Sequence, residues 1–125
     1  AMPFEKKGVS LTLSAAKVVY SPGEAIPLRM TLFNGTQEEL VLHFNTSQRY
    51  DFIVEATEGK GEAWRWSKGR MFLQVLGEEK VGPGRPTISY AAEIPSGLER
   101  GSYIVTGVMT SSDAPLSVSI PLQIR

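Results

Sequence analysis

The residue types that could do acid–base or metal chemistry are few in this chain and widely spaced. The only histidine, His43, lies within Leu40-Val41-Leu42-His43-Phe44, on the face opposite the apolar side chains of an expected strand. Neither a second histidine nor a cysteine is present to complete a zinc site. We therefore predict an exposed histidine on a sheet, no metal site and no cofactor.

Two acidic pairs, Glu38-Glu39 and Glu78-Glu79, lie beside expected turns. Neighbouring residues on a strand point in different directions, whereas a glycosidase needs two carboxylates aimed at one bond across about 5–10 Å. The sequence also lacks a G-x-S-x-G nucleophile elbow and the glycine-rich phosphate-binding motifs. These patterns indicate that the protein is not an enzyme.

Positive charge and aromatic rings alternate in one stretch of the chain. Arg65, Trp66, Lys68 and Arg70, with Arg49 upstream, resemble the platforms that bind single-stranded nucleic acid. However, 13 Lys and Arg balance 13 Asp and Glu, and no RNA-recognition or cold-shock motif is present. We therefore predict a basic loop beside a core tryptophan, and no nucleic-acid partner.

The elements that must position these residues are strands. Apolar and polar residues alternate repeatedly with a period of two, which is typical of strands with one buried face. Such strands need turns between them, and Ser21-Pro22-Gly23-Glu24 and Gly59-Lys60-Gly61 supply turn residues. The predicted strands include residues 9–15, 26–32, 40–44, 50–54, 64–66, 87–94, 103–109 and 116–124.

Four local signals refine this prediction. Asn34-Gly35 predicts a type I′ hairpin turn, and Pro121 places the last strand at a sheet edge, where a missing N–H costs little. Tyr103, at the start of the penultimate strand, resembles the tyrosine corner of immunoglobulin-type sandwiches. Only residues 68–76 could form a helical turn, because their apolar residues would then share a face.

The strand count and composition predict the fold class. Seven to nine short strands with turn signals between them indicate an all-β protein, an immunoglobulin-like antiparallel β-sandwich. The 125 residues fit one domain, residues 1–125, which can bury roughly two-thirds of its unfolded surface. No cysteine is available for a disulfide, and no apolar run approaches the ~20 residues of a membrane span.

The start of the sequence bears on the compartment. Ala1 precedes Met2, so we expect Ala1, and with it Met2, to be remnants of cloning. If a signal segment once preceded them, the protein would belong to the cell envelope or be secreted.

Three stretches in the middle of the chain carry a resemblance to a known family. Residues 45–54 (NTSQRYDFIV), 61–67 (GEAWRWS) and 71–74 (MFLQ) together resemble the intracellular proteinase inhibitor (BsuPI) family of bacilli and their relatives. Residues 20–24 (YSPGE) and 101–107 (GSYIVTG) resemble the flanking strands of that family. The resemblance implies an immunoglobulin-like sandwich that inhibits an intracellular subtilisin-like serine protease, and hence a cytoplasmic location. Arg85, where an acidic residue is expected, and Ala92, where an aromatic one is expected, depart from the pattern.

Most of the matching residues are expected to be structural. Each aromatic ring can bury ~150–250 Å², so Trp64 and Trp66 are predicted to hold the two sheets together. Asp51 and Arg65, on outward faces of neighbouring strands, could pair across the sheet for about 0.2–1 kcal/mol. The family-motif residues are Tyr50, Asp51, Phe52, Trp64, Arg65, Trp66, Phe72 and Gln74.

An inhibitor of this kind needs a segment that is held extended, so that binding loses little entropy and cleaved ends stay together. Two loops are candidates for the protease contact, one flanked by Trp66 and Phe72 and the other stiffened by proline. An edge strand that pairs with the protease is a third possibility. The first loop comprises Ser67, Lys68, Gly69, Arg70 and Met71, and the second comprises Lys80, Val81, Gly82 and Pro83.

The partner expected from the resemblance is therefore a serine protease, bound by a monomer. The alternative is a non-catalytic immunoglobulin-like adhesion or accessory module of the cell envelope that binds protein or glycan. A signal peptide or lipobox ahead of Met2 would favour that alternative.

Overall fold

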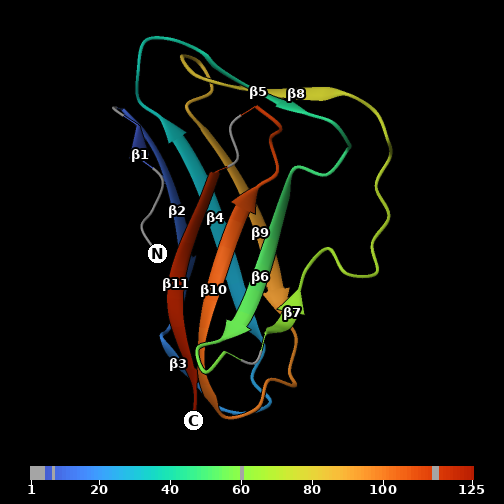
Figure 1. Cartoon of the computed structure of the whole chain (residues 1–125). Coiled ribbons are helices and arrows are strands. Elements are labelled where there is room, and N and C mark those ends of the chain that lie inside the picture. Colours follow the sequence, from blue (N-terminus) through green and yellow to red (C-terminus); the bar gives the residue numbers. More distant parts are fainter. Residues whose placement is uncertain (1–4, 7, 60, 114–115) are drawn as a thin grey trace.

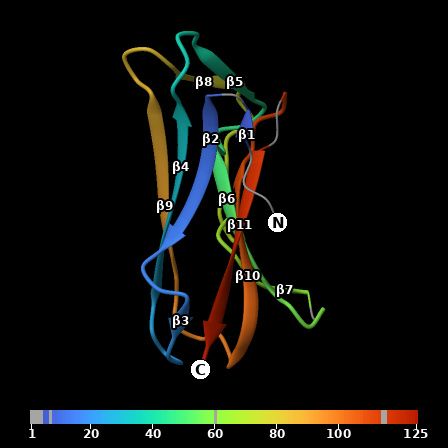
Figure 2. The same ribbon diagram turned by 90° about the vertical axis from the view of Figure 1, so that its left-hand side faces the viewer.

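The structure, a computed structural model, describes residues 5–6, 8–59, 61–113 and 116–125, with the side chains of residues 5 and 6 left aside. The described residues form eleven strands and no helix, and so nothing among them could cross a bilayer as a helix. The strands build two stacked sheets and a small third sheet at one end (Figures 1 and 2). This arrangement is the immunoglobulin-like β-sandwich that the sequence predicts.

The first sheet is antiparallel and has the order β1-β2-β4-β9. Its strands β2 and β4 alternate buried and exposed residues along most of their length, as a strand with one inward face must. Leu11 of β2 lies opposite Leu32 of β4, and Leu32 lies opposite Ile88 of β9. The strands are β1 (Glu5–Lys6), β2 (Val9–Ala15), β4 (Ile26–Asn34) and β9 (Thr87–Ile94).

The second sheet has the order β3-β11-β10-β6-β7. Its neighbours are antiparallel, apart from the two-residue β3, which pairs in parallel with the end of β11. The strands are β3 (Val19–Tyr20), β6 (Tyr50–Ala56), β7 (Glu62–Arg65), β10 (Gly101–Met109) and β11 (Leu116–Ile124).

Pro121 lies where its missing N–H breaks no ladder hydrogen bond. The N–H groups of Gln123 and Arg125 donate to the carbonyls of Val18 and Tyr20, at 2.8 and 2.9 Å. Since alternate N–H groups of a strand point the same way, the nitrogen of Pro121 also faces away from β10. The β11 strand is not the outermost strand of its sheet, but Pro121 lies beyond its short pairing with β3.

The remaining strands, β5 (Leu40–Phe44) and β8 (Gly77–Val81), pair with each other at one end of the sandwich (Figure 1). The predicted hairpin at Asn34-Gly35 is therefore wrong, because β4 and β5 belong to different sheets. The side chain of Asn34 is buried, and its Nδ2 donates to the carbonyls of Glu38 at 2.9 Å and Val81 at 2.8 Å. Asn34 thus ties the connection after β4 to the small sheet.

The inward faces of the two large sheets form one core of buried apolar residues. The sheets approach closely at Gly107 of β10, where a Cβ atom would lie 2.7 Å from the Sδ of Met30. The hydroxyl of Tyr103, near the start of β10, donates to the carbonyl of Glu99 at 2.7 Å. That bond confirms the predicted tyrosine corner.

The predicted helical turn in residues 68–76 is also wrong. Residues 66–69 form a turn, and residues 70–76 then run to β8 without a turn, a bend or strand pairing. We call residues 66–76 the β7–β8 connection. It runs along the side of the sandwich where β7 and β9 are the last strands of their sheets (Figure 1). Its apolar residues cannot share one buried face, because four of them are exposed.

Candidate functional site

A buried carboxylate fixes the start of the β7–β8 connection. Asp51 of β6 has only 4% of its surface exposed. Its Oδ1 accepts hydrogen bonds from the N–H of Phe52 at 2.9 Å and of Ser67 at 3.0 Å. Its Oδ2 accepts from the hydroxyl of Ser67 at 2.5 Å and from Nη1 of Arg65 at 3.4 Å. These hydrogen bonds offset the free-energy cost of removing the carboxylate from water.

The expected contact between Asp51 and Arg65 is therefore confirmed, but Asp51 does not lie on an exposed outward face. It is buried, and Ser67 in the turn at residues 66–69 contacts it through its N–H and its hydroxyl. The stronger partner of Arg65 is Glu62, whose Oε1 lies 2.6 Å from Nη2. The hydrogen bond from Arg65 holds the pKa of Glu62 below its ordinary value, and the same bond raises the pKa of Arg65.

An aromatic stack joins the two large sheets beneath the connection. The ring of Tyr50 stacks on Tyr90 of β9 with 4.5 Å between centroids, and on Trp66 with 4.4 Å. The guanidinium of Arg70 lies 4.1 Å from the centroid of Trp66. Trp66 is thus contacted by both Tyr50 and Arg70.

Burial affects Tyr90 most strongly in this stack. Desolvation raises the pKa of Tyr90 to about 12, so its phenol stays neutral. The hydroxyl is buried and has no hydrogen-bond partner among the described residues. Trp64, Trp66 and Tyr50 are partly buried and pack against the core, in agreement with their predicted role in cohesion.

The second half of the connection is fixed to the loop before β6. The N–H of Leu73 donates to Oγ of Ser47 at 2.8 Å, and the carbonyl of Leu73 accepts from the N–H of Ser47 at 2.9 Å. Nearer the turn, the ring of Phe72 lies 6.0 Å from that of Trp66, and Phe72 is partly buried. The family-motif residue Gln74 is exposed.

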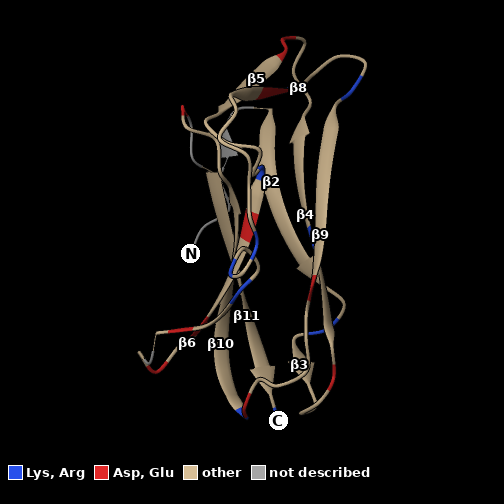
Figure 3. Ribbon diagram, turned by 90° about the vertical axis from the view of Figure 1, so that its right-hand side faces the viewer, with Lys and Arg blue, Asp and Glu red and all other residues tan. Residues whose placement is uncertain are grey.

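Four apolar side chains of the connection point into solvent. Their exposed fractions are 97% for Met71, 69% for Leu73, 51% for Val75 and 84% for Leu76. Exposed apolar residues are common singly, but a run of them in one extended segment is typical of an interaction site. Figure 3 views the side of the molecule along which the connection runs, with its acidic and basic positions coloured.

The first predicted contact loop therefore lies within the connection, but its members are not equivalent. Ser67 is partly buried and bonded to Asp51, whereas Lys68 and Gly69 form the exposed turn. Arg70 is exposed but lies along Trp66, to whose carbonyl its Nε donates at 2.9 Å. Met71 is the member with the least contact to its own chain.

The second predicted loop is more tightly built. Lys80 and Val81 belong to β8, and Val81 has no exposed surface. Gly82 is also buried, since a Cβ atom there would lie 2.8 Å from Cα of Glu39. Gly82 and Arg85 exchange backbone hydrogen bonds of 2.8 and 2.9 Å, which makes a tight turn with Pro83 exposed. Only Lys80 and Pro83 of this set can reach a partner.

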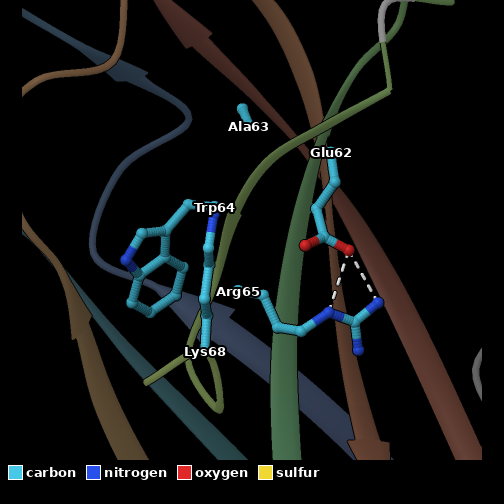
Figure 4. A pocket seen from close by; sticks show the side chains of 5 residues that line it. All are labelled: Glu62, Ala63, Trp64, Arg65 and Lys68. Carbon is cyan, nitrogen blue, oxygen red and sulfur yellow. Dashed lines mark hydrogen bonds and ion pairs between the residues drawn. The ribbon is translucent and has the colours of Figure 1, made fainter.

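A pocket of about 240 Å³ lies beside β7. Figure 4 shows the Lys68 side chain beside the Trp64 ring, with the ion pair of Glu62 and Arg65 on the other side. Lys68 forms no ion pair with a described residue. Because Lys68 lines the pocket, the pocket adjoins the first residues of the connection.

His43 is exposed, as predicted, and has two acidic neighbours. Its Nδ1 lies 2.6 Å from Asp113 and its Nε2 3.7 Å from Glu78. The hydrogen bond with Asp113 raises the pKa of His43 and lowers that of Asp113. Ser112 donates to the backbone carbonyl of His43 and not to its ring, so these three residues do not form a nucleophilic triad.

The acidic pairs are used for structure or face solvent. Glu79 pairs with Arg49 at 3.0 Å and with Arg85 at 3.6 Å, which gives Arg85 a local acidic partner. Within the described part of the chain, no cluster of three or more His, Asp or Glu side chains could hold a metal ion.

The site is thus that of a non-catalytic β-sandwich that presents a supported, exposed segment. Residues 13–114 match the intracellular proteinase inhibitor (BsuPI) family, and the chain belongs to this family. The match confirms the resemblance found in the sequence, and the family is one of inhibitors and not of enzymes. Its name describes intracellular proteins, in agreement with the cytoplasmic location that the resemblance implies. A protease is accordingly the partner that the family implies.

Two solved structures have a similar fold. The sporulation control protein Spo0M from Bacillus subtilis matches with a TM-score of 0.59 and 11% identity over 94% of this chain and 49% of that one. The alkylpurine DNA glycosylase AlkC from Pseudomonas fluorescens, bound to DNA with an abasic site analogue, matches with a TM-score of 0.55 and 16% identity over 94% and 30%. This chain spans less than half of either, and the likeness shows the fold alone. No curated protein sequence matches the chain.

Sequence reasoning missed three features of the site. It did not identify the tie between Leu73 and Ser47, the burial of Asp51 or the exposure of residues 73–76. Ser47 and Asp51 both lie in the motif NTSQRYD. That this motif and the connection belong to the same family pattern was the one signal in the sequence for their contact. In residues 71–76 (MFLQVL), apolar and polar residues alternate only in part. The spacing of the apolar residues is equally compatible with a helical turn.

Proposed function

We propose that the protein inhibits a subtilisin-like serine protease by placing the β7–β8 connection in the substrate cleft of the enzyme. One observation carries the proposal. Residues 70–76 run without a turn, a bend or strand pairing, present four exposed apolar side chains, and are hydrogen-bonded to the rest of the chain at Arg70 and Leu73. Family membership implies a proteinase as the partner, and the subtilisin-like class of that proteinase is what we propose.

The geometry suits cleft binding for an energetic reason. An extended segment pairs with the strands that line a cleft through its backbone N–H and C=O groups. Because Asp51, Ser47 and Tyr50 already hold the connection in place, less conformational entropy is lost on binding than for a free peptide. The exposed apolar side chains add favourable burial, at roughly 25 cal/mol per Å² of apolar surface.

The two predicted contact loops differ in how much extended, accessible backbone they offer to a protease cleft. Val81 and Gly82 are buried and Lys80 lies in a paired strand, so the second loop offers little extended backbone to a cleft. We therefore place the contact in the first loop and extend it to Leu76. Family membership likewise favours an inhibitor over an adhesion module.

Titration of a subtilisin-type protease with the purified protein tests this function. We expect peptide hydrolysis to fall linearly to an end point at about one inhibitor per enzyme, as for a tight monomeric inhibitor. The inhibitor should remain largely intact on a gel over the same period. Slow competition accompanied by complete digestion would show that the protein is only a substrate.

A matched pair of variants localises the contact. Leu73→Asp changes an exposed apolar residue of the connection, and Val18→Asp changes an exposed apolar residue, 57% accessible, outside it. We expect Leu73→Asp to weaken inhibition by at least about tenfold, equivalent to about 1.4 kcal/mol, and Val18→Asp to leave it unchanged. Equal inhibition by both variants would remove the connection from the proposed interface.

A further inference from the structure

We propose that Met71 is the specificity residue of this inhibitor, and that the Met71–Phe72 peptide bond is the one presented to the catalytic serine. The inference rests on the function proposed above and adds the residue that enters the apolar pocket beside the reacting bond. It also predicts how the inhibitor resists cleavage.

Exposure is the first argument for Met71. Its exposed fraction of 97% exceeds those of Leu76 at 84% and Leu73 at 69%, so Met71 contacts almost nothing in its own chain. A large apolar side chain in this position contributes little to folding and gains fully from burial in a partner. Methionine is unbranched and flexible, and therefore fits apolar pockets of varied shape.

The second argument is the support on both sides of Met71. On one side, the N–H of Arg70 donates to the carbonyl of Ser67 at 3.0 Å, and its guanidinium lies on Trp66. On the other side, the ring of Phe72 lies 6.0 Å from that of Trp66. Both neighbours of Met71 thus rest on the same tryptophan, which holds the exposed residue between two fixed points.

Met71 and Leu73 differ in whether their backbone groups already form hydrogen bonds. The carbonyl of Leu73 already accepts a hydrogen bond from the N–H of Ser47, so it is not available to an oxyanion hole. Neither Met71 nor Phe72 has a backbone–backbone hydrogen bond to another described residue. Gly69, with φ of 82°, turns the chain just before, so contacts with the cleft begin at Arg70 and continue toward Leu76.

The chemistry at this bond is reversible acyl transfer. The serine Oγ of the protease attacks the carbonyl carbon of Met71, and the C–N bond to Phe72 breaks. The proton of the serine passes through the histidine of the protease to the amino nitrogen of Phe72. Because Trp66 and Ser47 hold Phe72 and Leu73 in place, this amine stays beside the acyl carbon and reforms the peptide bond faster than water cleaves the ester.

Three variants test the assignment against a subtilisin-type protease and against trypsin. Met71→Asp is expected to weaken inhibition of the subtilisin-type enzyme by at least about 30-fold, as for a central anchor residue. Met71→Lys is expected to gain stoichiometric inhibition of trypsin, whose pocket takes a cation. Leu76→Lys, at an exposed apolar position of the same segment, is expected to gain none.

The cleaved bond gives an independent readout. After long incubation of the wild-type protein with the subtilisin-type protease, mass spectrometry is expected to find a minor product pair that ends at Met71 and begins at Phe72. If the wild type inhibits but Met71→Asp inhibits equally, or the cut lies elsewhere, the Met71 assignment is overturned and the inhibitory function stands. If the wild type does not inhibit, the proposed function fails and the assignment fails with it.

Discussion

Asp51 shows how one residue of a structural motif can serve a surface site. A carboxylate with 4% of its surface exposed is costly to bury unless it is hydrogen-bonded. Asp51 meets this need with the backbone and side chain of Ser67, and so fixes the first residues of the β7–β8 connection. The same bonds that stabilise the fold therefore orient the segment that we propose to bind the protease.

Replacement of Asp51 by asparagine is expected to weaken both stability and inhibition. The amide can replace one acceptor oxygen but presents N–H groups to the Ser67 hydroxyl and to Arg65. Since hydrogen bonds to charged groups contribute about 1.5–3 kcal/mol, we expect urea denaturation to show a loss of about that size. Inhibition should fall further than in Glu55→Gln, a change of an exposed acid on the same strand. Equal inhibition constants for the two variants would separate Asp51 from the site.

Two tyrosines give a matched test of what a buried hydroxyl contributes. Tyr103→Phe removes the bond to the carbonyl of Glu99, and we expect it to cost about 0.5–1.5 kcal/mol. Tyr90→Phe removes a hydroxyl with no partner among the described residues, and we expect the free energy of unfolding to stay the same or rise. The reverse order of stabilities would contradict the tyrosine corner as a stabilising feature.

At the scale of elements, the strands and the connection differ in what determines their shape. Each long strand is fixed by ladder hydrogen bonds and by an inward apolar face, as in β10, which pairs with both β6 and β11. The connection has neither, and its path depends on separate contacts to Asp51, Tyr50 and Ser47. Between these contacts, Met71 and Phe72 have no backbone–backbone hydrogen bond to another described residue, so their backbone groups remain available to a partner.

The close approach of the two sheets predicts a strict limit at Gly107. In Gly107→Val, the new side chain would overlap Met30, whose Sδ lies 2.7 Å from the position of a Cβ atom. Overpacking of this kind costs typically about 1–3 kcal/mol, and urea denaturation should show it. Val108→Ile, at the next residue of β10 and only partly buried, is the control and should change stability by less than about 0.5 kcal/mol.

Across the whole molecule, polar contacts attach the small β5–β8 sheet to the sandwich. His43 of β5 bonds to Asp113, in the turn between β10 and β11, through both its ring and its backbone N–H. Arg49 pairs with Glu79 of β8 at 3.0 Å, and Asn34 donates to Val81. These contacts join segments that lie far apart in the sequence.

The pair of His43 and Asp113 predicts a pH dependence of stability. The pKa of His43 is raised above 6.5 and that of Asp113 is lowered below 3.8, with Glu78 as the other charge facing the ring. The stabilising contribution is therefore complete between pH 3.8 and 6.5, is lost as the pH rises through the raised pKa of His43, and is lost in acid as the pH falls through the lowered pKa of Asp113.

Thermal melts of the wild type and of His43→Gln from about pH 5 to 9, spanning the usual range of histidine titration, check this prediction. The difference in Tm should shrink as the pH rises. Lys17→Gln, which removes a surface ion pair with Glu24, should give a constant difference over the same range. A difference for His43→Gln that is independent of pH would contradict the role of the charged ring.

Most of the fold follows from local patterns in the amino-acid sequence. Strict alternation in residues 26–32 and 116–124 predicts strands β4 and β11, because a period of two places every apolar side chain on one face. The tyrosine corner at Tyr103 and the family pattern around Trp64 and Trp66 could also be predicted, because each signal is contained in a short stretch of sequence. The exposure of His43 also followed from its place opposite the apolar residues of β5.

Other parts of the fold depend on contacts between residues far apart in the chain, which local patterns do not contain. Asn34-Gly35 has the local chemistry of a hairpin, but Asn34 instead donates across the fold to Val81, which no local signal contains. Residues 68–76 have helical spacing, yet tertiary contacts from Asp51 and Ser47 draw them into an extended path. Local pattern fixes which face a side chain takes, whereas the path of an unpaired segment depends on partners from elsewhere in the chain.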